Sequence, residues 1–197
     1  MKRIYIFPRY SGDENSDWYQ KVRHEILLKD QGIQIIPLSF PNWDKPDIIE
    51  FLLTIDTILP PEEIDSETYF VGHSIGCKAA LFYLDKLQKQ NTLLKIGGLL
   101  CIAGWWTIDK PWLQLKPWLN HSVDYTKIQE ICQNNIMTLL SNNDPFTSDT
   151  QGNKTLWKKN LKAEVIIIPE AKHFNNEGYD EIINNIVRLT SQKSDIQ

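Results

Sequence analysis

Short runs of hydrophobic residues alternate along the chain with longer segments in which hydrophobic residues recur every three or four positions. The short runs are rich in β-branched and aromatic residues, which is typical of strands, and the longer segments have the period of amphipathic helices. The pattern predicts six strands, at residues 4–7, 33–38, 68–71, 98–102, 136–140 and 165–168. It also predicts four helices, around residues 18–26, 48–55, 79–87 and 179–187.

The predicted strands are hydrophobic at consecutive positions, which is typical of parallel strands covered on both faces. Parallel strands are joined by right-handed crossovers, so we expect an α/β fold, a three-layer α/β/α sandwich around a six-stranded parallel sheet. We expect one domain over residues 1–197. The least regular stretch, about residues 104–125, is rich in tryptophan and proline and is interpreted as an insertion over the sheet.

Composition and charge exclude several classes of function. The formal net charge is −4 and the lysines are scattered among acids, so neither nucleic acid nor an anionic membrane is an expected partner. Cys77, Cys101 and Cys132 lack the spacing of metal ligands and are interpreted as reduced thiols. The first residues form too short a hydrophobic run for a signal peptide, and no run reaches transmembrane length. We therefore expect a cytoplasmic protein.

The sequence Gly72-His73-Ser74-Ile75-Gly76 follows the third predicted strand and precedes a predicted helix. This is the context of a nucleophile elbow, a strand-to-helix turn that raises a serine hydroxyl above the edge of a parallel sheet. Glycine on both sides avoids the collisions that larger side chains would make in so tight a turn. Ser74 is thus the predicted nucleophile, and a serine that only caps the helix is the competing interpretation.

A serine nucleophile requires a general base, and the base requires an acid that orients it. His173 follows the last predicted strand and Asp144 follows the fifth, so both belong at the same sheet edge as Ser74. The order Ser, Asp, His is that of the α/β-hydrolase fold. Asp144 precedes a proline and could instead serve a structural turn, and the alternative acids are Asp124 and Asp149.

These motifs resemble those of the small serine-hydrolase family that includes retinoblastoma-binding protein nine and its bacterial relatives. The resemblance covers most of the chain and is carried by residues 72–76, 124–128, 143–146 and 173–175. It implies a minimal α/β-hydrolase with the strand order 2-1-3-4-5-6. It also implies catalytic triad roles for Ser74, Asp144 and His173.

Two departures from the family pattern concern the site. The glycine-rich loop after the first strand is replaced by residues 8–12, so the second oxyanion donor is expected to be the backbone N–H of either Arg9 or Tyr10. The first donor is expected to be the N–H of Ile75, directly after the nucleophile. The glycine that usually precedes the catalytic histidine is here Lys172, which is expected to be exposed.

Aromatic residues near the predicted site indicate a substrate pocket. We expect it to be lined by Trp105, Trp106 and Phe146, and an aromatic insertion that packs only on the body of the protein is the competing interpretation. His73 and Cys77 lie close to the nucleophile in the sequence. Both are interpreted as packing or hydrogen-bonding residues rather than as a base or a second nucleophile.

The chemistry that these residues favour is acyl transfer from a small carboxylic ester to water through an acyl-enzyme. The expected partner is this small-molecule substrate, and the reaction needs neither a metal ion nor an organic cofactor. One alternative is an acyltransferase or thioesterase on the same three residues. The other is a catalytically weak binding or scaffold protein whose oxyanion loop is unsuitable.

Overall fold

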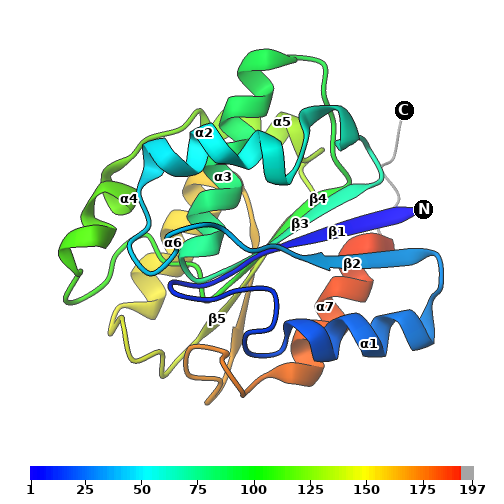
Figure 1. Ribbon diagram of the computed structural model, residues 1–197. Helices are drawn as coiled ribbons and strands as arrows, with labels where there is room; N and C mark the ends of the chain where they lie inside the picture. Colours follow the sequence, from blue (N-terminus) through cyan, green and yellow to red (C-terminus); the bar gives the residue numbers. More distant parts are fainter. Residues whose placement is uncertain (192–197) are drawn as a thin grey trace.

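The computed structural model describes residues 1–191 and contains a six-stranded parallel sheet in the order β2-β1-β3-β4-β5-β6 (Figure 1). The strands are β1 Lys2–Phe7, β2 Ile33–Pro37, β3 Thr68–His73, β4 Gly98–Ile102, β5 Ile136–Ser141 and β6 Glu164–Ile168. All five neighbouring pairs run parallel. The predicted strands, the parallel sheet and the strand order are confirmed.

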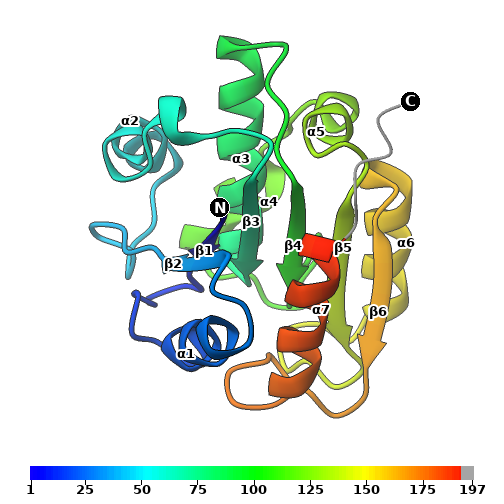
Figure 2. The same cartoon turned by 90° about the vertical axis from the view of Figure 1, so that its right-hand side faces the viewer.

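Helices cover both faces of this sheet. They are α1 Tyr19–Lys29, α2 Ile48–Ile58, α3 Ile75–Gln90, α4 Lys116–Asn120, α5 Tyr125–Ile131, α6 Thr150–Leu161 and α7 Tyr179–Ser191, and 3-10 turns span Pro61–Glu63 and Leu113–Leu115. Helices α1 and α7 pack on one face and α2 to α6 on the other (Figure 2). This confirms the predicted three-layer α/β/α sandwich.

The burial of alternate residues on opposite faces explains the continuous hydrophobicity of the strands. In β1, Ile4 and Ile6 pack into the core under α1 and α7. Tyr5 and Phe7 pack into the core on the other face of the sheet. A strand of this kind has no polar side, because water reaches neither face.

The hydrophobic pattern does not predict α4, α5 and α6. Helix α6 buries Asn153, Trp157 and Leu161, so a polar residue takes the first core-facing position. The Asn153 amide oxygen accepts the backbone N–H groups of Trp106 at 2.6 Å and Thr107 at 3.1 Å. A buried amide with such partners is compatible with the core, but it interrupts the hydrophobic period by which helices are recognised.

The register of the strands brings the segments that follow them to one edge of the sheet. Phe7, the last residue of β1, pairs with Gly72 in β3. Ser141, the last residue of β5, pairs with Ile168, the last residue of β6. The segments after β1, β3, β5 and β6 therefore begin side by side at the carboxyl edge, where ligands bind in open parallel α/β sheets.

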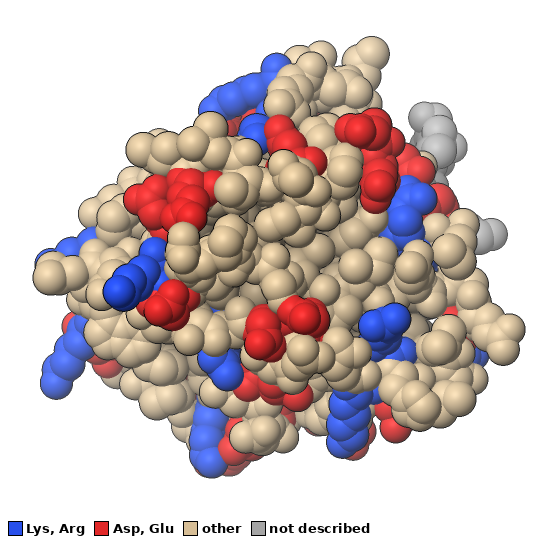
Figure 3. Space-filling model, in the orientation of Figure 1, with Lys and Arg blue, Asp and Glu red and all other residues tan. Residues whose placement is uncertain are grey.

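The surface carries both signs of charge. Acidic and basic side chains are interspersed on the face drawn in Figure 3, as the scatter of lysines among acids along the sequence leads one to expect. Among the helices within residues 1–191, none combines the length and the apolar character that crossing a bilayer requires.

Candidate active site

Ser74 joins β3 to α3 through a strained turn. Its φ of 59° and ψ of −122° lie outside the regions that residues with a side chain normally adopt. A Cβ on Gly72 would lie 2.5 Å from Cys77 Cα, and a Cβ on Gly76 would lie 2.1 Å from the carbonyl oxygen of Phe7. Both glycines are therefore needed for close backbone approach. Ser74 stands at the N-cap position of α3, yet its hydroxyl makes no capping hydrogen bond.

A chain of two hydrogen bonds connects Ser74, His173 and Asp144. Ser74 Oγ lies 2.9 Å from His173 Nε2, and His173 Nδ1 lies 2.7 Å from Asp144 Oδ2. The three residues are 5%, 6% and 8% exposed, respectively, so bulk water hardly competes for these contacts. An ionised carboxylate only accepts, so the proton sits on Nδ1 and leaves Nε2 to accept from the serine hydroxyl. This is the tautomer that a general base needs.

The carboxylate of Asp144 accepts a hydrogen bond within its own turn as well as the one from the imidazole. Its second oxygen, Oδ1, accepts the backbone N–H of Phe146 at 2.9 Å. The two roles that the sequence left as alternatives thus fall on different oxygens of one side chain. Asp124 and Asp149, the other candidate acids, each cap a helix by accepting an N–H of its first turn, in α5 and α6.

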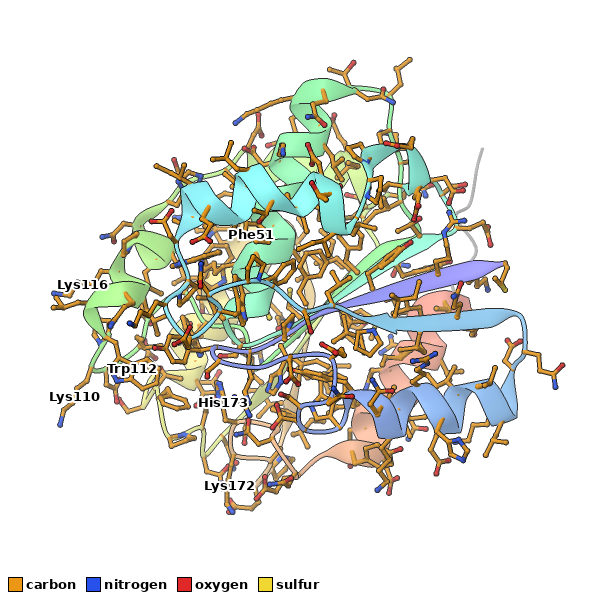
Figure 4. The ribbon with its side chains drawn as sticks, in the orientation of Figure 1. Phe51, Lys110, Trp112, Lys116, Lys172 and His173 are labelled. Atoms are coloured by element: carbon orange, nitrogen blue, oxygen red, sulfur yellow. The ribbon has the colours of Figure 1, made fainter. Side chains whose placement is uncertain are left out.

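The loop that carries His173 is fastened to the loop that carries Asp144. Lys172 has a φ of 46°, in the left-handed region, which is why glycine suits the position before the histidine. Its backbone N–H donates to Asn143 Oδ1 at 2.8 Å, and its ammonium pairs with Glu177 at 2.7 Å. In Figure 4 Lys172 points away from the body of the protein, whereas His173 lies within it.

Among the backbone N–H groups of residues 9–12, directly after β1, one is left without a partner in the part of the chain that the structure describes. The N–H of Arg9 donates to the hydroxyl of Tyr19 at 3.0 Å. The N–H groups of Ser11 and Gly12 both bond backbone carbonyl groups. Tyr10 N–H has no partner within residues 1–191. The Arg9 N–H, one of the two predicted candidates, is therefore already engaged, and the Tyr10 N–H is left as the candidate second oxyanion donor.

The candidate first donor, the N–H of Ile75, belongs to the first residue of α3. Backbone N–H groups in the first turn of a helix have no acceptor within the helix. The partial positive charge at a helix N-terminus also favours a nearby anion. The geometry at Ile75 therefore suits an oxyanion.

A cavity of about 190 Å³ opens in front of Ser74. Its walls include the aromatic side chains of Tyr10, Trp105, Trp112 and Phe146. The ring centroids of Tyr10 and Trp112 are 5.2 Å apart, and those of Trp112 and Phe146 are 5.7 Å apart. The volume lies below the roughly 300–1,000 Å³ of sites for drug-sized ligands, so this cavity suits a compact group.

Trp106 does not line this cavity, in contrast to the prediction. Its ring packs against Tyr125 and Trp157, with centroids 5.3 Å and 5.1 Å away. The ammonium nitrogen of Lys78 lies 3.7 Å from its ring centroid. The two tryptophans are adjacent and their side chains point in different directions, so Trp105 faces the cavity while Trp106 packs among α3, α5 and α6.

The other two tryptophans of the insertion, Trp112 and Trp118, likewise differ in whether they lie at the cavity or in the core. Trp112 is 46% exposed at the rim of the cavity, and Lys110 beside it extends outward into solvent (Figure 4). Trp118 is fully buried, and its ring stacks on Phe82 at 5.4 Å. The insertion is therefore a cavity wall at some residues and part of the core at others.

Tyr19 is a residue near the site that the sequence does not single out. Its hydroxyl lies 2.9 Å from Nδ1 of His73, which is 54 residues further along the chain. The hydrophobic period that predicts this helix is carried by Trp18, Val22 and Ile26, and such a period carries no information on what a tyrosine hydroxyl bonds.

Comparison with known proteins bears on the family and the fold of the chain. A family model described as serine hydrolase matches residues 4–191. The protein YdeN of Bacillus subtilis (strain 168) is 28% identical over 129 residues, which span 66% of this chain and 64% of YdeN. The crystal structure of the ydeN gene product matches with a TM-score of 0.80 at 23% identity and covers 98% of this chain and 100% of that chain.

Two less similar proteins share the fold. Est1E from Butyrivibrio proteoclasticus, solved with ferulic acid bound, has a TM-score of 0.69 at 10% identity, over 98% of this chain and 90% of Est1E. The type II thioesterase BorB of the borrelidin biosynthetic cluster has a TM-score of 0.64 at 15% identity, over 96% of this chain and 91% of BorB. At these identities the likeness establishes the α/β-hydrolase fold and nothing more specific.

Proposed function

This chain belongs to the serine hydrolase family, and from that premise we propose that it hydrolyses small carboxylic esters through an acyl-enzyme on Ser74. The observation that carries the proposal is the hydrogen-bonded chain from Ser74 through His173 to Asp144, with distances of 2.9 Å and 2.7 Å. A lone serine hydroxyl is a weak nucleophile. These hydrogen bonds supply it with a base, His173, and with a group that orients the base, Asp144.

In the first half of the reaction, Ser74 Oγ attacks the ester carbonyl carbon as its proton passes to His173 Nε2. Asp144 stabilises the imidazolium that forms. When the tetrahedral intermediate collapses, His173 returns the proton to the departing alcohol, and the acyl group stays on Ser74. In the second half, water loses a proton to His173 and attacks the acyl carbon, which releases the acid and restores the serine hydroxyl.

The negative charge that develops on the carbonyl oxygen needs hydrogen-bond donors. The backbone N–H groups of Ile75 and Tyr10 fit this role, since neither has a partner in the described part of the chain and Tyr10 lines the cavity. Donors of this kind act best when they are fixed before the reaction, and losing one typically costs about a hundredfold or more in kcat.

The size and walls of the cavity favour a short acyl group or a single flat ring. About 190 Å³ leaves little room for a long alkyl chain, and the walls are aromatic. Aromatic walls stabilise planar groups through edge and face contacts. That Est1E, a structural neighbour, was solved with ferulic acid bound supports including aryl esters among the substrates to be tried.

The test is hydrolysis of a panel of para-nitrophenyl esters of increasing acyl length, with a benzoate and matched thioesters. We expect kcat/KM to be highest for acetate, butyrate or benzoate and to fall by roughly tenfold or more at octanoate, because the cavity cannot enclose the longer chain. Thioester rates above those of the matched oxygen esters would identify a thioesterase instead.

Two pairs of variants separate catalysis from folding. Ser74→Ala and His173→Ala should abolish ester hydrolysis. Ser66→Ala and His24→Ala remove the same groups from exposed positions and should leave it unchanged. Activity retained by Ser74→Ala, or a folded wild type that cleaves neither esters nor thioesters, would refute the proposal.

A further inference from the structure

His73, the residue before the nucleophile, has both ring nitrogens engaged. Nδ1 lies 2.9 Å from the hydroxyl oxygen of Tyr19, and Nε2 lies 2.9 Å from the backbone carbonyl oxygen of His173. The Tyr19 hydroxyl also accepts the backbone N–H of Arg9 at 3.0 Å. An unbroken chain of hydrogen bonds thus runs from the loop after β1, through α1 and the elbow, to the loop that carries His173.

The direction of each bond in this chain follows from the groups themselves. A carbonyl oxygen only accepts, so His73 Nε2 carries a proton and donates it to the His173 carbonyl. Nδ1 is then the acceptor, and the Tyr19 hydroxyl donates to it while accepting from Arg9 N–H. Every donor has an acceptor, and the arrangement requires an uncharged His73.

The surroundings of His73 keep it uncharged. The side chain is fully buried, and the loss of hydration lowers the pKa of His73 to about 3, with repulsion from His173 and Arg9 as smaller causes. The nearest carboxylate oxygen, Asp17 Oδ2, lies 3.9 Å from Nδ1 and is already paired with Arg9 Nε at 2.7 Å. At the N-terminal end of α1, two uncharged rings face His73, those of the N-cap residue Trp18 and of Tyr19.

We infer that His73 and Tyr19 form a positioning pair for the hydrolysis proposed above, on which this inference rests. Tyr19 engages the Arg9 N–H, which leaves the next N–H, that of Tyr10, free for the oxyanion. His73 holds the carbonyl of His173, whose ring is the base. Neither residue touches the substrate, and together they fix the distance between the oxyanion loop and the base.

Such a pair acts on the rate because catalysis depends on the placement of the reacting groups. A displacement of about 1 Å caused by a change away from the chemistry can cost on the order of a hundredfold in rate. Without the Tyr19 hydroxyl, the Arg9 N–H and His73 Nδ1 both lose their partner. The two loops would then be free to shift relative to each other, while the cavity walls that bind the acyl group would remain.

Tyr19→Phe tests this inference because it removes one oxygen and keeps the ring, which packs against Trp18 at a centroid distance of 4.7 Å. The matched control is Tyr83→Phe. Tyr83 is likewise fully buried, and its hydroxyl donates to a backbone carbonyl, that of Leu59, outside the site. Tyr83→Phe loses one buried hydrogen bond, whereas Tyr19→Phe loses two, so a loss of thermal stability is expected in both variants and a larger one in Tyr19→Phe.

We expect Tyr19→Phe to lower kcat for a short ester by about tenfold or more with KM within about twofold, and Tyr83→Phe to leave both at the wild-type values. The inference is overturned if Tyr19→Phe keeps kcat within about twofold of wild type, or if both variants lose kcat equally. An inactive wild type in the same assay refutes the proposed function, whereas an active Tyr19→Phe refutes only the positioning pair.

A second measurement uses the wild-type protein. Nitrogen-15 NMR of the histidine rings should find His73 protonated at Nε2 alone and unchanged between about pH 5 and 8. A doubly protonated His73 ring anywhere in this range, or a proton on Nδ1, would overturn the inference.

Discussion

Individual residues within and next to the candidate triad hold backbone conformations that cost free energy. Ser74, Lys172 and Phe174 all have positive φ, at 59°, 46° and 57°. Each such residue costs on the order of 1–3 kcal/mol and persists only where its surroundings fix it. Here the glycines of the elbow and the hydrogen bond from Lys172 N–H to Asn143 provide that fixation.

Gly76→Ala tests the close approach at the elbow. The added methyl group would lie 2.1 Å from the Phe7 carbonyl oxygen, and neither backbone can move without disturbing Ser74. We expect a loss of about 3 kcal/mol or more in the free energy of unfolding, with ester hydrolysis lost as well. Urea denaturation measures the loss in the free energy of unfolding. Gly32→Ala is the control, because its methyl group would meet only the Asp30 side chain, and equal losses in the two variants would contradict the argument.

Lys172→Gly tests whether the side chain beside the base has a role in catalysis, apart from the left-handed backbone conformation at this position. Its side chain is exposed and paired with Glu177, so we expect kcat to stay within about twofold of wild type. Relief of strain and the greater freedom of glycine in the unfolded chain oppose each other, so stability should change by less than about 1 kcal/mol. A loss of activity of roughly tenfold or more in steady-state assays would mean that the Lys172 side chain influences His173.

Among the secondary-structure elements, the strands could be predicted from sequence because they are buried on both faces and hydrophobic throughout. Ser74, Asp144 and His173 could be placed at one edge because each follows a strand end. Helix α6 could not be predicted, since Asn153 interrupts its hydrophobic period. The choice between adjacent tryptophans could not be made either, because the direction of each side chain depends on backbone contacts made across the fold.

Asn153→Leu tests the polar contact that links α6 to the segment after β4. The change keeps approximate volume but leaves the backbone N–H groups of Trp106 and Thr107 without an acceptor. We expect the free energy of unfolding to fall by about 2–4 kcal/mol, measured by urea denaturation. Lys159→Ala, at an exposed position of the same helix, should change it by less than about 0.5 kcal/mol. An equally stable Asn153→Leu would contradict this role.

Across the fold, the candidate site is assembled from segments that are far apart in the sequence. His73 and the backbone of His173 are 100 residues apart, and Tyr19 precedes His73 by 54. Contacts of this kind are made only when helix α1 packs on the finished sheet, which is why the sequence did not identify Tyr19. Because the hydrogen bonds of Tyr19 and His73 are buried, they affect the stability of the protein as well as the site.

The buried His73 makes stability depend on pH. Its pKa is lowered to about 3 in the native state from an ordinary 6.5, so between these values the unfolded chain binds one more proton. The contribution of His73 to the free energy of unfolding is therefore fully present above pH 6.5. Below pH 6.5 this contribution falls by about 1.4 kcal/mol per pH unit, so that about 2 kcal/mol is lost at pH 5. Urea denaturation across this range, repeated with His73→Gln, should give a shallower slope in the variant, and equal slopes would contradict the argument.

The central claim is that Ser74 is an activated nucleophile, and a fluorophosphonate probe with mass-spectrometric mapping tests it most directly. We predict a single labelled residue, Ser74, and no labelling in Ser74→Ala or His173→Ala, because the probe reacts only where a base activates the hydroxyl. His24→Ala should label like the wild type. A folded wild type that takes up no probe, or label on another residue, would contradict the account.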